Sequence, residues 1–310
     1  MHLHSPASRA DAIDLVLSTA PPFDTDGARE LFGRGSLDRT FDSGQRALDR
    51  VWQAREGDRP LGLVGGRTIG GLALVDLVAL PVDDAAADAL VAAATAWART
   101  HPDAEAGFET PASDQPLDDP AARRIVDRFT AAGWRLLVTR RHYHLTPSDV
   151  AHAQPAPLPP TMRLERATAT EEPRVRRLVA RMLVDSLDVR DAAAVAEHGL
   201  AAAADELTDE LLESDPIDSI RFAVDGEDAA FVSYRLLADG RGFVMQVGVA
   251  ASHRGRGLST QLVDVATRDL VAQGATMLIA DTDDANVPMI RGFARAGWQA
   301  TASRIDLVLD

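Results

Sequence analysis

The chain has 310 residues, no cysteine and a formal net charge of −15 at pH 7. Without cysteine there can be no disulfide, no thiolate metal site and no cysteine nucleophile, and the acidic balance disfavours nucleic-acid binding, which depends on clustered Lys and Arg. This length is typical of two domains, each able to bury a core.

The sequence indicates neither a secretory leader nor a membrane span. Its start, Met-His-Leu-His-Ser-Pro, lacks the charged and apolar regions of a signal peptide. The most apolar stretch, 61–82, is interrupted by Arg67 and Asp76, whereas a span needs about 20 apolar residues. We therefore expect a soluble, cytoplasmic protein that does not act at a membrane.

Strand-like and helix-like segments alternate in the first half and predict an α/β unit. In chain order they are strand 72–80, helix 85–100, strand 104–110, helix 120–132 and strand 136–145. The stretch 149–160 then carries four prolines without periodicity, which is typical of an extended linker. We therefore expect one domain at 1–148 and a second at 161–310, joined by the linker 149–160.

The second half predicts a similar order of elements after an additional helical region. The expected elements are strand 162–167, helix 171–183, a helical region 192–213, strands 221–224, 230–237 and 242–249, helix 259–273, strand 275–280, a helix between Asn286 and Gly297, and strand 303–309. Residues 128–134, Arg-Phe-Thr-Ala-Ala-Gly-Trp, resemble residues 292–298, Gly-Phe-Ala-Arg-Ala-Gly-Trp. The halves are therefore predicted to be tandem copies of one unit, with chance similarity as the alternative.

A short loop between strand 242–249 and helix 259–273 contains Gly255 and Gly257. Glycine lets the backbone approach a ligand closely, and the N–H groups of the first helical turn form a site for an anion such as a pyrophosphate. Arg254 and Arg256 can add positive charge. The pattern is neither a dinucleotide fingerprint nor a P-loop, and a plain connection is the alternative. The first copy has Pro-Val-Asp-Asp-Ala-Ala at 81–86, so we do not expect it to bind phosphate there.

The run Arg254-Gly-Arg-Gly-Leu-Ser259 resembles the Arg/Gln-x-x-Gly-x-Gly/Ala acyl-CoA signature of the GNAT acyltransferase superfamily, although Ser259 departs from its last position. The segment 286–298, Asn-x-Pro-Met…Phe…Ala-Gly-Trp, is similar to the family's next motif. The resemblance covers 161–310 and implies a tandem protein with a degenerate N-terminal copy, similar in layout to mycothiol synthase. It implies an α/β (α+β) fold of two GNAT-like domains, each a mixed, mostly antiparallel twisted sheet flanked by helices.

The resemblance also implies acetyl-CoA as the cosubstrate, with no metal, and pantetheine lying in a gap between two strands. The residues that it implies for the cofactor site are Val247, Gly248, Val249, Arg254, Gly255, Arg256, Gly257, Leu258, Ser259, Thr260, Asn286 and Phe293.

For catalysis the resemblance implies direct transfer in a ternary complex, assisted by a base. Asp281, after strand 275–280, is the candidate base, with loop charge ahead of a helix as the alternative. Gln246 could position the acceptor, and Tyr234 is either a polar group at the cleft or half-buried structure. The family often has a tyrosine acid where this chain has Phe293, which has no proton to donate.

We therefore expect an N-acyltransferase that moves an acetyl group from acetyl-CoA to the primary amine of a small molecule. The net negative charge is compatible with a cationic substrate. The alternatives are a non-catalytic acyl-CoA sensor and a scaffold protein with a vestigial loop. His142 and His144 are of a type that binds metal, but no further ligand is evident near them. Neither the acceptor nor the oligomeric state follows from the sequence.

Overall fold

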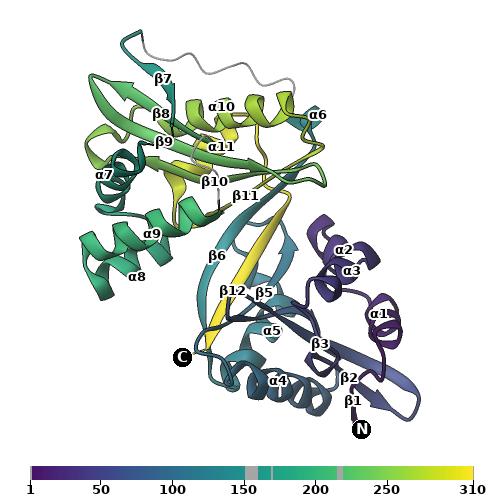
Figure 1. Cartoon of the computed structure of the whole chain (residues 1–310). Helices are drawn as coiled ribbons and strands as arrows, with labels where there is room; N and C mark the ends of the chain where they lie inside the picture. The colour runs from purple at the N-terminus through teal and green to yellow at the C-terminus, as the bar shows by residue number, and fades with distance from the viewer. Residues whose placement is uncertain (1, 151–159, 169, 215–218, 310) are drawn as a thin grey trace. The chain divides into compact units, whose positions relative to one another are not determined.

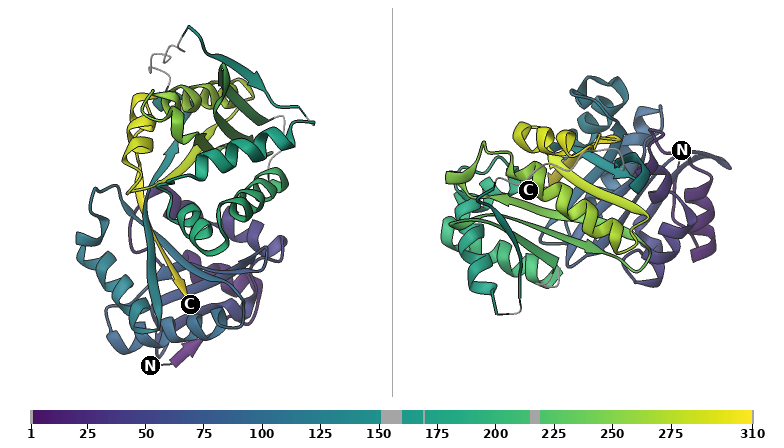
Figure 2. Two further views of the ribbon diagram at one scale, coloured as in Figure 1. Left: turned by 90° about the vertical axis from the view of Figure 1, so that its left-hand side faces the viewer. Right: turned by 90° about the horizontal axis from the view of Figure 1, so that it is seen from above.

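A computed structural model of the chain describes residues 2–150, 160–168, 170–214 and 219–309 (Figure 1). The chain divides into two compact units, Met1–Arg140 with Ala302–Asp310, and Arg141–Thr301. Each unit contains a mixed, mostly antiparallel sheet flanked by helices, which is the fold class expected from the sequence (Figure 2). Most of the predicted linker, residues 151–159, lies outside the described residues.

The sheet of the first unit has the order β1-β2-β3-β4-β5-β12-β6, and its pairs from β1 to β12 are antiparallel except for the parallel pair β4–β5. One face packs on α4 and α5 and the other on α1 and α3, so β4 is apolar along almost its whole length. The elements of this unit are β1 (His2–His4), α1 (Arg9–Leu17), α2 (Asp26–Leu31), α3 (Arg34–Asp42), β2 (Val51–Glu56), β3 (Arg59–Ile69), β4 (Leu72–Ala79), α4 (Asp84–Ala98), β5 (Ala104–Pro111), α5 (Pro120–Ala131), the first part of β6 (Trp134–Leu145) and β12 (Ala302–Leu309).

The second unit has the order β6-β11-β10-β9-β8-β7, in which β10 and β11 are parallel and the pairs from β10 to β7 antiparallel. Side chains alternate between its faces, because Val232 packs with α10 and Phe231 packs with α7 and α9. Its elements are the end of β6, α6 (Pro147–Val150), β7 (Arg163–Arg166), α7 (Glu172–Leu183), α8 (Val189–His198), α9 (Leu200–Ser214), β8 (Ile220–Asp225), β9 (Glu227–Leu236), β10 (Arg241–Val249), α10 (Leu258–Ala272), β11 (Met277–Asp283) and α11 (Val287–Arg295).

The domain boundaries differ from the predicted 1–148 and 161–310, because each unit takes a strand from the other half of the sequence. Strand β12 pairs with β5 in an unbroken antiparallel register, and its Ile305 and Leu307 are fully buried in the core of the first unit. The end of β6 places Tyr143 and Leu145 in a core of the second unit. An apolar alternation shows that a strand is half-buried, but it does not specify which sheet the strand joins.

An indole contact recurs in both units, at corresponding positions of the predicted internal repeat. The Trp134 Nε1–H donates to Thr95 Oγ1 at 2.8 Å, and the Trp298 Nε1–H donates to Thr267 Oγ1 at 2.9 Å. In each copy the indole also lies against the phenylalanine five residues earlier in the chain, with ring centroids 5.5 and 5.4 Å apart. In both copies, therefore, the tryptophan that follows a glycine turn is anchored to a threonine on an earlier helix, which is α4 in the first copy and α10 in the second.

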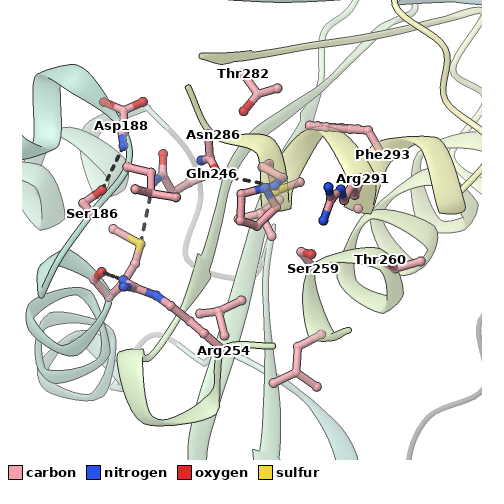
Figure 3. Close-up of a pocket in the computed structure, with 18 of the residues that line it drawn as sticks. Ser186, Asp188, Gln246, Arg254, Ser259, Thr260, Thr282, Asn286, Arg291 and Phe293 are labelled. Atoms are coloured by element: carbon pink, nitrogen blue, oxygen red, sulfur yellow. Dashed lines mark hydrogen bonds between the residues drawn. The ribbon is translucent and has the colours of Figure 1, made fainter. Parts of the chain in front are cut away.

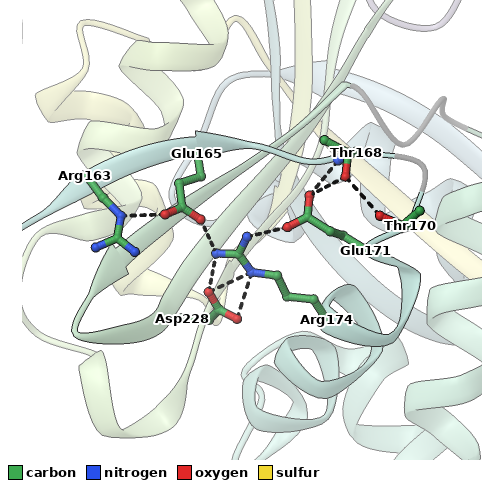
Figure 4. A network of polar contacts seen from close by, with 7 residues as sticks. All are labelled: Arg163, Glu165, Thr168, Thr170, Glu171, Arg174 and Asp228. Atoms are coloured by element: carbon green, nitrogen blue, oxygen red, sulfur yellow. Dashed lines mark hydrogen bonds and ion pairs between the residues drawn. The ribbon is translucent and has the colours of Figure 1, made fainter.

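One arginine fixes the start of the second unit. The guanidinium of Arg174 on α7 donates to Glu165 of β7, to Glu171 and to Asp228 of β9 (Figure 4). Together these carboxylates raise its pKa, and its guanidinium also lies 4.0 Å from the ring centre of Phe222. This network holds α7 against the sheet, and the C-terminal end of α7 forms one side of the candidate site.

We predict that Thr95→Val and Thr267→Val each destabilise the protein, because each leaves a buried indole N–H without an acceptor while keeping the side-chain shape. The expected cost is about 1–3 kcal/mol for each substitution. Denaturant unfolding followed by tryptophan fluorescence measures it. Unchanged unfolding in either variant would contradict the equivalence of the two anchors.

Candidate functional site

The second unit contains a cavity of about 480 Å³ where β10 and β11 separate (Figure 3). These parallel strands are paired only from Arg241 with Met277 to Phe243 with Ile279. Beyond that point β10 has an irregular register with β9, between Val244 and Gln246. The two strands diverge, and residues of both line the cavity together with the loop before α10, the start of α10, α11 and the segment before α8.

One end of the cavity is formed by the glycine loop and the first turn of α10. Gly257 is the N-cap of this 15-residue helix, has φ of +79° and carries no side-chain cap. Gly255 has φ of +76°, and nothing lies within 4 Å of where a Cβ would stand on either glycine. Ser259 and Thr260 also line this end. Amide groups at an uncapped helix N-terminus with open space beside them suit an anion.

The corresponding helix of the first unit is closed by its own side chains. Asp83 is the N-cap of α4, and its carboxylate accepts from the Ala86 N–H at 2.7 Å. Arg124 donates to the Val82 carbonyl and to Asp84 beside it. In the first unit, therefore, a carboxylate occupies the N-terminus of α4, whereas the N-terminus of α10 in the second unit has no side-chain cap. The two aspartates of this loop were the reason why the sequence did not predict a phosphate site there.

Two predicted cofactor arginines have different positions in the structure. Arg254 lines the cavity, and its guanidinium donates to the carbonyls of Met182 at 2.6 Å and Asp185 at 3.0 Å, joining the loop to the end of α7. Arg256 does not line the cavity and forms an ion pair with Asp225. Its predicted contact with the cofactor stays a prediction.

The structure also adds two cations that sequence reasoning missed. Arg295 and Arg291, the latter labelled in Figure 3, lie on α11, are both exposed and both line the cavity. They are four residues apart on a helix and therefore share a face. That spacing was a signal available in the sequence, next to the motif that begins at Asn286.

Most of the other predicted cofactor residues meet at the cavity. Those that line it are Val247, Val249, Leu258, Asn286 and Phe293. Asn286 caps α11 by accepting from the Met289 N–H at 3.3 Å. Gly248 does not line the cavity and instead packs against Phe231 and Met182.

The three predicted catalytic residues separate into two groups. Gln246 and Asp281 line the cavity, with Gln246 Nε2 lying 3.7 Å from the Met182 sulfur. Tyr234 does not line it and is only 2 % exposed. Its hydroxyl donates to Asp269 on α10, and its pKa is raised by burial and by that hydrogen bond. Tyr234 therefore lies in the interior, as in the structural alternative, and is more buried than that alternative expected.

Two carboxylates that sequence reasoning missed, Asp188 and Asp191, line the cavity near the start of α8. Asp188 caps this helix by accepting from the N–H groups of Arg190 and Asp191. Burial, followed by the charge of Asp188, raises the pKa of Asp191 to about 6. The cavity lining therefore combines cationic and amide groups with carboxylates.

Among the described residues, no group of three or more His, Asp or Glu is arranged to hold a metal ion. His142 instead lies 2.7 Å from Asp281, through Nδ1 and Oδ1. No helix in the part of the chain that the structure describes is both long and apolar enough to cross a bilayer.

Residues 189–298, which contain most of the cavity lining, match the acetyltransferase (GNAT) family. The fold is similar to that of a GCN5-related N-acetyltransferase from Sphaerobacter thermophilus, with a TM-score of 0.63 and 15 % identity over 99 % of this chain and 94 % of that one. It is also similar to a tandem GNAT protein from the clavulanic acid biosynthesis pathway, with a TM-score of 0.52 and 19 % identity over 99 % and 98 %. No curated protein matches the chain in sequence.

We predict that Asp191→Asn stabilises the protein at neutral pH. Below about pH 3 the carboxyl is protonated in both the folded and the unfolded chain, so wild type and variant should be equally stable. As pH rises from about 4 to 6, the carboxyl ionises in the unfolded chain but stays protonated in the folded wild type, and this difference costs the wild type about 3 kcal/mol of stability at pH 7. Denaturant unfolding at both pH values measures the difference, and equal stability at pH 7 would contradict the raised pKa.

Proposed function

We propose that this chain, a GNAT-superfamily protein by the match over residues 189–298, transfers an acetyl group from acetyl-CoA to the primary amine of a small molecule. The observation that carries this proposal is the polarity of one cavity. An uncapped helix N-terminus with open space beside two glycines lines it together with carboxylates.

In this proposal the pyrophosphate of acetyl-CoA binds the amide groups between Gly255 and Thr260. Arg291 and Arg295 add positive charge for the phosphate groups, while Arg254 keeps the loop joined to α7. Pantetheine lies between the diverging strands, beside Val247 and Val249. The thioester is then directed towards the end of β11, where Asp281 lies.

Asp281 acts as the base in the proposed reaction. It takes a proton from the substrate ammonium group, the amine nitrogen then bonds to the acetyl carbon, and the carbon–sulfur bond breaks. An amide N–H of β10 polarises the carbonyl while this happens. The nitrogen releases a second proton as the amide forms, and the thiolate takes up one proton. Solvent mediates this last exchange, because Phe293 has no proton to give.

We further propose that the acceptor amine is cationic before it reacts. Asp188 and Asp191 line the cavity together with Asp281, and a positive charge near Asp191 would relieve the cost of its ionisation. The net charge of −15 also attracts a cation over a long range.

A non-catalytic acyl-CoA sensor is the second candidate, and Phe293 is the observation that favours it. This residue lines the cavity but is 2 % exposed, and its ring stacks on that of Tyr143 with centroids 4.4 Å apart. A sensor would bind acetyl-CoA but would release no thiol when amines are added.

We predict that Gly257→Glu abolishes acetyl-CoA binding and amine-dependent thiol release, because a carboxylate would occupy the phosphate end of the cavity. Gly226→Glu is the matched control, since Gly226 has φ of +73° and open space beside it in the β8–β9 turn, outside the cavity. Both variants carry a similar backbone cost of about 1–2 kcal/mol. Calorimetry and a thiol assay across a panel of amines measure the effects. Equal binding by the two variants would contradict the assignment of this loop.

A further inference from the structure

The end of β6 contacts two residues that line the candidate site, and the neighbouring Asp284, and residues 161–310 alone do not provide these contacts. Arg141 Nε lies 2.6 Å from Asp284, and His142 Nδ1 lies 2.7 Å from Asp281. Tyr143 stacks on Phe293. The proposed base and the residue at the family's usual acid position are therefore both contacted by the last strand of the first sequence repeat.

The contact between His142 and Asp281 has a fixed geometry. The backbone that follows the imidazole is held by Thr301, whose N–H donates to the His142 carbonyl at 2.9 Å and whose Oγ1 accepts from the His144 N–H at 3.0 Å. The side chain of His142 is only 11 % exposed, whereas that of Asp281 is 33 % exposed and lines the cavity. The imidazole therefore contacts Asp281 from the protein interior, while the carboxylate remains accessible from the cavity.

The chemistry of the pair defines the direction of the hydrogen bond. An ionised carboxylate only accepts, so the proton lies on Nδ1 when Asp281 is charged. A hydrogen bond to the charged form stabilises the carboxylate and restricts its rotation. These are the two properties that a carboxylate base needs when an ammonium group approaches from the cavity.

We infer that His142 is a positioning residue for acyl transfer, and that it holds Asp281 ionised and directed into the cavity. The inference rests on the proposed function. It makes the strand β6, which the sequence assigns to the degenerate copy, necessary for the chemistry of the second unit.

Other charged groups surround the pair and contribute to any pH dependence. Asp283 on β11 accepts from the Val189 N–H at 2.8 Å, and Asp284 is paired with Arg141. Asp188 and Asp191 line the cavity near α8. Asp191 gives its own titration near pH 6, and that titration should be present in every variant of His142.

The test compares His142→Ala and His142→Asn with His144→Ala in the full-length protein. The Asn amide nitrogen is two bonds from Cβ, as Nδ1 is, so it can donate to Asp281. We expect His142→Ala to lower kcat about tenfold or more and to move the acidic limb of the kcat/KM profile to higher pH. The Kd for acetyl-CoA should be unchanged. His142→Asn should recover most of kcat, and His144→Ala, two residues along the same face, should behave as wild type.

The outcomes separate this inference from the proposed function. A wild-type protein that binds no acetyl-CoA, or that releases no thiol with any amine, would overturn the proposed function. An active wild type, with kcat and the pH profile unchanged in His142→Ala, would overturn only the inference. Equal losses in the Ala and Asn variants, accompanied by lower melting temperatures, would make His142 a structural residue and would also overturn it.

Discussion

The candidate site depends on the early end of one parallel strand pair. Strands β10 and β11 are paired from Arg241 to Phe243 and then diverge, although each continues for several residues. Backbone groups that would have completed the ladder instead face the cavity, and such groups need a partner. A ligand with its own amides, such as pantetheine, would supply one. In the proposed function, the uncapped start of α10 and the carboxylates can act on one ligand because both line the cavity at this gap.

A comparison of the two repeats shows that the open site lowers the local stability of the fold. Both keep the same buried anchor, with Trp134 bound to Thr95 and Trp298 bound to Thr267. The first caps its helix with Asp83, which is a stabilising choice of about 1 kcal/mol relative to a residue that cannot cap. The second has an uncapped glycine there and a carboxylate at Asp191 whose ionisation is unfavourable. Local stability is lower where a ligand would bind, which is typical of functional sites.

The sequence predicted the parts of the site that lie close together in the chain. The glycine loop and α10 were recognisable because cap residues, apolar spacing and a family motif occur within about 20 residues. The contacts of Tyr234 with Asp269 and of Arg256 with Asp225 could not be predicted, because no local pattern reveals these partners. His142 was considered only as a metal ligand, since its contact with Asp281 joins residues far apart in the sequence. The sequence also did not reveal that each unit takes a strand from the other half of the chain. The pairing partners of a strand are set by tertiary structure and not by its own pattern.

The central claim is that one acyl-CoA site exists in each chain, at the start of α10, and that the first repeat has none. Titration of acetyl-CoA into the full-length protein by calorimetry tests it most directly, because the stoichiometry counts the sites. We predict one site per chain. Two sites would contradict the closure of α4 by Asp83, and the absence of binding would contradict the acyltransferase account and leave a scaffold protein.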